Sequence, residues 1–419
     1  MALNLLQEKG IPMEKQFKSW ADLNSKPYDK ESVHPYTRTR GILMNGIEVD
    51  ATLFKHEFAR HTDDMDLKRS LGLSRRVEQQ QQKAINWMIP GNESNIEVTL
   101  GYEQVAVDLT AYLAQTEPDD YVRQALDFAL LEDFDHLYRY ANYMKMIMDK
   151  DPSSVTKQYT EITLGRPTAF HHRHPIDEVR NFVDYSTADP LTKLHIQTIT
   201  AAEQQTMNFY MNVGDRAADM IGRGLYLEIG QVEEQHVSHY ESLADPRISW
   251  FEMLLNHELN ECWLYYSLMN DEPNADARKL WEDNFAMEIE HLKHAAELMK
   301  MYEKRDPAQF VPADMSTVPM FKFQSNIDYI RGIIESQLDY TASETRFMPL
   351  DEAPGKDRFI SFQAMVNAKG NPSETVVDEL IMKTGNDYRN EIAGAYPIEK
   401  YRRKEAVAAV RQRIREIQA

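Results

Sequence analysis

Along most of the chain, apolar residues recur at the three- and four-residue intervals of a helix, and the strict alternation of a strand is scarce. Breakers such as Pro118, Pro246 and Pro273 divide this pattern into segments joined by short turns. The long helices expected from it are 96–116, 121–148, 191–213, 216–243, 248–270 and 275–302. Paired in chain order they form three αα-hairpins, so the sequence predicts an all-α fold.

The two ends of the chain carry weaker patterns. Pro12, Pro27 and Pro35 indicate an irregular start up to about residue 50, with a short alternating stretch at 41–50 as a candidate strand. Residues 51–88 follow a helical pattern. Near the C-terminus the expected helices are 325–340, 373–392 and 397–418.

These patterns predict three regions. An N-terminal extension that is partly helical covers 1–95, and a helical bundle covers 96–302, with 150–190 as a long crossover. A C-terminal helical extension covers 303–419. The crossover matters because a helix of about 25 residues is about 37 Å long, and only a long connection can return along it.

The amino-acid composition limits the partners and the kinds of metal site that this chain could have. The 419 residues include 67 acidic and 47 basic ones, a net charge of −20, which argues against nucleic acid as a partner. A single cysteine, Cys262, excludes disulfide frameworks and thiolate metal sites held by this chain alone. No apolar run is long enough to span a membrane and the start lacks a secretory pattern, so we expect a cytoplasmic protein without a membrane partner. Metal ligands would then be histidines and carboxylates.

A repeated register of acids and histidines marks the three hairpins. Each has an acid in its first helix, a second acid whose number is higher by 30, and a histidine three residues after that. The three sets are Glu103 with Asp133 and His136, Glu203 with Glu233 and His236, and Glu258 with Glu288 and His291. Two residues at this spacing with a turn midway lie level on antiparallel helices, and an i, i+3 pair shares one helix face.

This register predicts a metal site. Two facing hairpins would supply four carboxylates and two neutral imidazoles, which balance two divalent ions and suit iron or manganese. An acid three residues before a histidine is common by chance in so acidic a chain, and surface charge on amphipathic helices is the competing interpretation. The shared spacing of 30 favours the metal site. Tyr210 and Tyr265, each seven residues after an acid of the set, are candidate catalytic groups.

Three hairpins are one more than a four-helix site needs, and the sequence leaves two assignments open. The long crossover at 150–190 favours hairpins one and two, because the joint between hairpins two and three has only seven residues. Complete Glu-x-x-His motifs favour hairpins two and three. His171, His172 and His174 lie in the crossover, where we expect solvated side chains rather than ligands.

The hairpins resemble the ferritin-like di-metal carboxylate proteins, which include rubrerythrin, bacterioferritin and the di-iron monooxygenases. The matching segments are GYEQVAVDLTAYLA with ALLEDFDHLYRY, TAAEQQTMNFY with GQVEEQHVSHY, and NHELNECWLYY with FAMEIEHLKHAAEL. The resemblance implies a four-helix bundle holding two iron ions, with manganese as the alternative, and chemistry on dioxygen or peroxide. The sequence departs from the family at Asp133, where glutamate is usual.

The length of the chain beyond the bundle helps to choose among the functions that this resemblance implies. The chain adds long extensions to the bundle, which favours an oxygenase- or oxidase-type oxidoreductase acting on a small organic substrate. The alternative is a ferritin- or rubrerythrin-like protein for metal storage or peroxide detoxification, and a third reading is a helical scaffold with an empty motif. An oxygenase would need a separate electron-transfer protein as partner, and the chain is a candidate homo-oligomer. Tyr210 and Tyr265 would hydrogen-bond a carboxylate or carry an electron.

Overall fold

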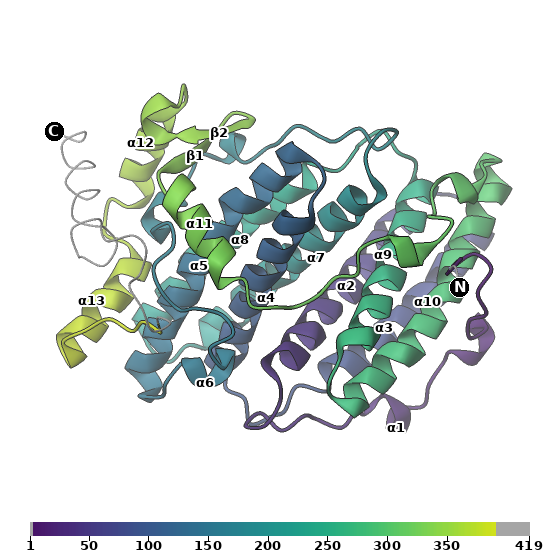
Figure 1. The fold of residues 1–419 in the computed structure, drawn as a ribbon, viewed down its shortest axis with the longest axis horizontal. Helices are drawn as coiled ribbons and strands as arrows, with labels where there is room; N and C mark the ends of the chain where they lie inside the picture. Colours follow the sequence, from purple (N-terminus) through teal and green to yellow (C-terminus); the bar gives the residue numbers. More distant parts are fainter. Residues whose placement is uncertain (1–2, 391–419) are drawn as a thin grey trace.

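A computed structural model of the chain describes residues 3–390 and shows a mostly helical protein (Figure 1). Within these residues there are thirteen α-helices and one two-stranded antiparallel hairpin, which confirms the expected all-α class at this coarse level. The expected helix at 397–418 lies outside the described residues. No helix over 3–390 has both the length and the apolar composition to cross a membrane.

Eight long helices form four antiparallel hairpins. Their bounds are α2 Pro35–Arg60, α3 Met65–Asn86, α4 Asn95–Thr116, α5 Asp120–Met148, α7 Pro190–Val213, α8 Met220–Glu241, α9 Trp250–Asp271 and α10 Ala275–Glu303. Helices α4, α5, α7 and α8 pack together as the first bundle, and α2, α3, α9 and α10 as the second bundle (Figure 1). The inner helices α2, α4, α7 and α9 join the two bundles, and one hydrophobic core runs through both.

The two halves of the helical region are a repeat. Adding 155 to the residue numbers at both ends of α3, α4 and α5 gives the bounds of α8, α9 and α10, and the first residues of α2 and α7 differ by the same offset. Each bundle takes one hairpin from each half. The same local signals recur, since Asp64 and Asp219 cap α3 and α8, and Ser94 and Ser249 cap α4 and α9 through side-chain hydrogen bonds.

The N-terminal region differs from its prediction. Residues 41–50 are not a strand but part of α2, which begins at Pro35, where the fixed φ of proline suits the first helical position. The pattern expected as one helix over 51–88 ends at Arg60 and restarts at Met65. Helix α2 lies at the junction of the two bundles, and its residues up to Glu48 are buried on nearly all sides, so this part of the sequence carries no amphipathic stripe.

The expected boundary at residue 95 separates α2 and α3 from helices with which they share a core. The structure therefore contains four hairpins rather than the three expected, because α2 and α3 supply the partner of α9 and α10. The three-region division otherwise stays a prediction.

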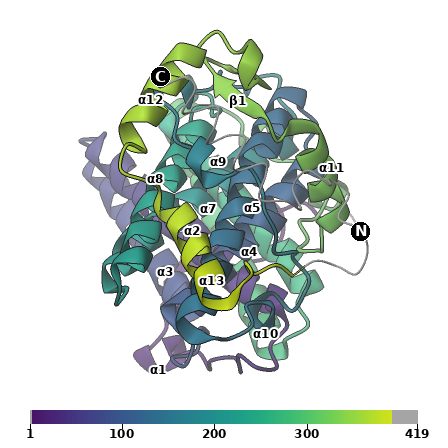
Figure 2. The same ribbon diagram turned by 90° about the vertical axis from the view of Figure 1, so that its left-hand side faces the viewer.

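The remaining elements lie mostly over the first bundle. The α-helices and strands are α1 Trp20–Leu23, α6 Ser153–Thr156, α11 Ile327–Gln337, β1 Tyr340–Ser343, β2 Arg346–Pro349, α12 Lys356–Val366 and α13 Pro372–Thr384. The 3₁₀ turns are η1 Met13–Lys15, η2 Thr168–Phe170, η3 Pro175–Asp177, η4 Gly214–Arg216, η5 Pro307–Gln309, η6 Met315–Thr317 and η7 Leu350–Glu352. Helix α13 packs on α5 and α8, and α11 on α5 (Figure 2). The part of the C-terminal extension described from α11 onward thus covers the first bundle.

Candidate metal centres

Six side chains meet inside the first bundle, and we call them the first cluster. They are Glu103 on α4, Asp133 and His136 on α5, Glu203 on α7, and Glu233 and His236 on α8. All are at most 1% exposed. The structure therefore brings together the residues predicted from hairpins one and two, the pair that the length of the crossover favours.

The donor atoms of the first cluster form two overlapping groups. Glu103, His136 and Glu233 offer atoms within 4.8 Å of one another, and so do Asp133, Glu203, Glu233 and His236. Glu233 belongs to both groups and approaches both imidazoles, at 3.0 Å from His136 Nδ1 and 3.3 Å from His236 Nδ1. The arrangement suits two ions that share Glu233.

Hydrogen bonds outside the cluster determine which imidazole nitrogen faces inward. His171 Nε2 donates to the Arg166 carbonyl oxygen at 2.6 Å, so its Nδ1 accepts from His136 Nε2 at 3.1 Å. His236 Nε2 donates to Glu132 Oε2 at 3.1 Å. Both ligand candidates therefore turn the lone pair of Nδ1 toward the carboxylates, as metal-binding histidines do.

Glu132 is kept ionised for this task. Burial opposes its charge, but the Arg173 guanidinium, which binds both of its oxygens, holds the pKa of Glu132 well below its ordinary value. Arg166 adds a third contact to the same carboxylate. Glu132 was not predicted from the sequence, and His171, which was expected to be solvated, is wholly buried against His136.

The first cluster has more acceptors than donors. Among the described residues no lysine or arginine pairs with its four carboxylates, and seven of its buried polar atoms have no hydrogen-bond partner. These atoms are Glu103 Oε2, Asp133 Oδ1 and Oδ2, Glu203 Oε1 and Oε2, Glu233 Oε2 and His236 Nδ1. Each such atom costs free energy in a buried site unless a cation or proton reaches it. Four negative charges with two neutral imidazoles match two divalent ions, so the residues fit a di-metal centre.

The pKa values of these groups reflect the same excess of negative charge. Burial and the neighbouring carboxylates raise the pKa of Glu103 and of Glu203 well above their ordinary values. Burial opposes a charged His236, but Asp133 outweighs it and raises the pKa of His236 well above its ordinary value. In the absence of metal the cluster therefore takes up protons.

Of the two predicted tyrosines, one lies at the first cluster. The Tyr210 hydroxyl donates to Glu103 Oε1 at 2.5 Å and is wholly buried. Tyr265 lies in the second bundle, where its hydroxyl donates to Glu48 Oε1. The two tyrosines therefore serve different clusters.

The third predicted set, Glu258, Glu288 and His291, lies in the second bundle with residues that the sequence analysis did not identify. Together they form the second cluster, made of Glu48 on α2, Glu78 and Gln81 on α3, Glu258 on α9, and Glu288 and His291 on α10. Glu78, Glu258, Glu288 and His291 offer atoms within 4.8 Å of one another. Two more buried charged side chains, Lys55 and Glu261, adjoin the cluster.

Two signals in the sequence identify these missed residues. Glu48 and Glu78 have the same spacing of 30 as the acids of the other three hairpins, but Gln81 stands where a histidine was required. Every member of the second cluster also has a counterpart in the first at an offset of 155 in residue number, as Glu48 has in Glu203. The same offset relates Gln16 to His171. Gln16 hydrogen-bonds His291, and His171 hydrogen-bonds His136, which is the counterpart of His291.

Comparison of the chain with protein-family models, curated proteins and solved structures finds no match to any of the three. The two clusters are therefore the features of this protein from which a function can be inferred.

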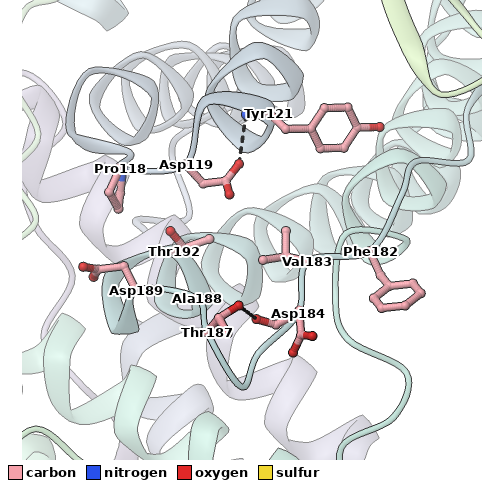
Figure 3. Close-up of a pocket in the computed structure, with 10 residues that line it drawn as sticks. All are labelled: Pro118, Asp119, Tyr121, Phe182, Val183, Asp184, Thr187, Ala188, Asp189 and Thr192. Carbon is pink, nitrogen blue, oxygen red and sulfur yellow. Dashed lines mark hydrogen bonds between the residues drawn. The ribbon is translucent and has the colours of Figure 1, made fainter.

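A surface pocket of about 400 Å³ lies at one end of the first bundle, between the α4–α5 turn and the start of α7 (Figure 3). Its lining includes Tyr121, Phe182 and Thr192, and no member of either cluster. Thr192 precedes Glu203 on α7 by eleven residues. That spacing corresponds to about 16 Å along the helix, so the pocket does not open onto the cluster.

Proposed function

We propose that the protein is an oxidoreductase built on a di-metal carboxylate centre at the first cluster, with two iron ions, or manganese, as its cofactor. The observation that carries the proposal is the donor set: four buried carboxylates and two inward imidazole lone pairs converge without a permanent cation. Two divalent ions supply the charge that this set lacks. The resemblance of the hairpins to the ferritin-like di-metal proteins points to the same chemistry.

Each side chain has a role in this proposal. Glu233 would be a ligand common to the two ions, because its carboxylate belongs to both groups of donor atoms. Glu103 and His136 complete one set of ligands, and the remaining three residues complete the other. When bound, a pair of iron or manganese ions supplies the electrons for the reduction of dioxygen or peroxide. The Tyr210 hydroxyl holds Glu103 in place and is a candidate electron carrier.

The surroundings of the first cluster favour an oxygenase- or oxidase-type enzyme acting on a small organic substrate. The crossover supplies His171, and α13 covers α5 and α8, so the ligands lie in a buried interior. A dry, enclosed site limits the loss of reactive oxidants to water. With one cysteine in the chain, electrons would come from a separate electron-transfer protein unless peroxide is the oxidant.

The proposal is tested by metal content and turnover of the full chain. We expect about two iron or manganese ions per chain after anaerobic loading, together with reductant-dependent dioxygen consumption or peroxide turnover. Glu233→Gln should remove both, because it withdraws the shared ligand. Glu234→Gln is the matched control, because Glu234 is the next residue on the same helix and its side chain lies outside the cluster.

Three results would contradict the proposal. The first is a loaded chain without tightly bound metal, and the second is a Glu233→Gln variant that keeps its metal and turnover. The third is many ions per chain without turnover, which would identify a storage protein instead.

A further inference from the structure

A lysine adjoins the second cluster at the position where a tyrosine adjoins the first. Lys55 and Tyr210 are related by the same offset of 155 and occupy the same position in the two halves of the repeat. Lys55 is wholly buried, and its ammonium forms ion pairs with Glu78 Oε1 and, at 2.8 Å, with Glu258 Oε1. A permanent cation thus lies between two carboxylates that correspond to Glu233 and Glu103 of the first cluster.

The other carboxylates of the second cluster also meet donors from the protein. Gln81 Nε2 donates to Glu288 Oε1 at 2.5 Å, from the position that a ligand histidine occupies in the first cluster. The Tyr265 hydroxyl donates to Glu48 and accepts from Asn284 Nδ2 at 3.0 Å. Each of the four carboxylates therefore has one oxygen at the Lys55 ammonium or at a hydrogen-bond donor, although Glu48 Oε2, Glu78 Oε2 and Glu258 Oε2 have no hydrogen-bond partner. In the first cluster both oxygens of Asp133 and both of Glu203 lack such a partner.

One set of metal ligands nevertheless survives in the second cluster. His291 Nε2 donates to Gln16 Oε1 at 2.7 Å, which turns the Nδ1 lone pair toward Glu288 Oε2 at 2.8 Å. His291 with Glu78 and Glu258 corresponds to the group of His136, Glu233 and Glu103, and Glu288 corresponds to Asp133. A divalent ion in that group and the Lys55 ammonium would compete for the same oxygen atoms and repel each other.

We propose that the second cluster is a latent site for one divalent metal ion, closed by the Lys55 ammonium, so that the chain carries a single di-metal centre in its first bundle. Glu78, Glu258, Glu288 and His291 are the ligands that the lysine holds, and a transition ion such as Mn²⁺ or Fe²⁺ is what their chemistry would accept. Loss of the amine, rather than addition of a ligand, would open the site. This inference goes beyond the proposed function, because it concerns the other bundle.

The experiment starts from full-length protein in which Glu233→Gln and His236→Ala disable the first cluster, because Glu233 belongs to both of its groups of donor atoms. This background is compared with the same protein carrying Lys55→Met, which keeps the length of the side chain but not its charge, or Lys55→Arg, which keeps the charge. Each is incubated anaerobically with Mn²⁺, desalted and analysed for manganese. We expect no tightly bound ion in the background or with Lys55→Arg, about one ion per chain with Lys55→Met, and loss of that ion on adding Glu258→Gln.

Each outcome decides the question. A tight ion in the Lys55-containing background that Glu258→Gln removes would overturn the proposal, as would a folded Lys55→Met variant that binds no manganese. If Lys55→Met unfolds without metal, recovery of a cooperative thermal transition with Mn²⁺ supports the latent site. If it stays unfolded with Mn²⁺, the Lys55-containing background is the only test. The absence of a Glu258-dependent ion in that background then supports the proposal. A wild-type first cluster without metal would defeat the proposed function but leave the Lys55→Met result valid.

Discussion

In the first bundle, four buried carboxylates face two imidazole lone pairs and no permanent cation from the described residues. In the second bundle, the equivalent helices present an equivalent set of carboxylates, but Lys55, Gln81 and Tyr265 reach into it. The two halves repeat the same helices, because their helix bounds differ by a constant 155 in residue number except at the C-terminal ends of α2 and α7. The difference teaches that the frame provides a place for buried carboxylates, while a few side chains decide whether a cation of the protein enters it: the Lys55 ammonium does so in the second bundle, and no lysine or arginine of the described residues does so in the first.

The sharpest test of this comparison is a matched pair of substitutions. Glu203→Gln and Glu48→Gln alter equivalent positions in the two halves of the repeat. Glu203→Gln should weaken metal binding and turnover by at least about 100-fold, because it removes a ligand and a neutralising charge. Glu48→Gln should leave both unchanged. Titration with Fe²⁺ or Mn²⁺ and a dioxygen electrode measure the two effects, and equal losses in both variants would end the distinction between the bundles.

The second prediction concerns the stability of the metal-free protein. In excess chelator, Lys55→Met should lower the free energy of unfolding by about 3–5 kcal/mol, because it leaves buried carboxylates without their cation. Tyr210→Phe, at the equivalent position, removes one neutral donor and should cost about 1 kcal/mol. Urea denaturation compares them, and a Lys55→Met loss no larger than that of Tyr210→Phe would contradict the role of the ammonium.

The third prediction tests the cover that the C-terminal extension gives the first bundle. Asp127 on α5 accepts a hydrogen bond from Tyr329 of α11, and burial, opposed by this bond and by Arg123, raises the pKa of Asp127 to about 6. The folded protein therefore binds more protons than the unfolded chain between about pH 4 and pH 6, and stability falls as pH rises through that window. The full effect of this shift is about 3 kcal/mol.

Asp127→Asn should remove this part of the pH dependence, leaving a flatter profile of unfolding free energy from pH 4 to pH 6. Urea titrations across that range give the slope. An unchanged slope would mean that Asp127 ionises normally in the folded protein.

The smallest effect is expected from the outer hydrogen bonds. His171→Ala should weaken metal binding to the first cluster by about 10- to 100-fold, because His136 loses the acceptor that orients its ring. Gln16→Ala removes the equivalent partner of His291 in the second cluster and should leave metal content unchanged. Competition with a chelator of known affinity resolves these differences, and a loss of metal in Gln16→Ala would show that the second cluster also binds it.

Much of the fold follows from local sequence. The expected helices 96–116 and 275–302 match α4 and α10 to within a residue, because Ser94 and Asn274 cap their first turns. The start of helix α2 could not be predicted in this way. It is buried on nearly all sides, so neither a polar face nor a hydrophobic stripe distinguishes it from an irregular segment.

The residues of the candidate sites also divide into those that the sequence predicted and those that it did not. The register of 30 identified the acids and histidines within each hairpin, because turn position and helical rise fix that spacing locally. It missed Glu48 and Glu78, since their hairpin has Gln81 in place of the histidine that anchored the search. It also missed Glu132 and His171, whose roles depend on contacts with side chains distant in sequence.

The sequence by itself determined the helical class, the three hairpins after residue 95 and the acid–histidine pairs within them, because these depend on contacts between residues close along the chain. Only the tertiary structure decided which hairpins meet. It joined α4 and α5 to α7 and α8, left α9 and α10 to α2 and α3, and brought Lys55 against Glu258. Such contacts join segments far apart in the chain, and their energy comes from burying one helix face against another, which no local pattern specifies.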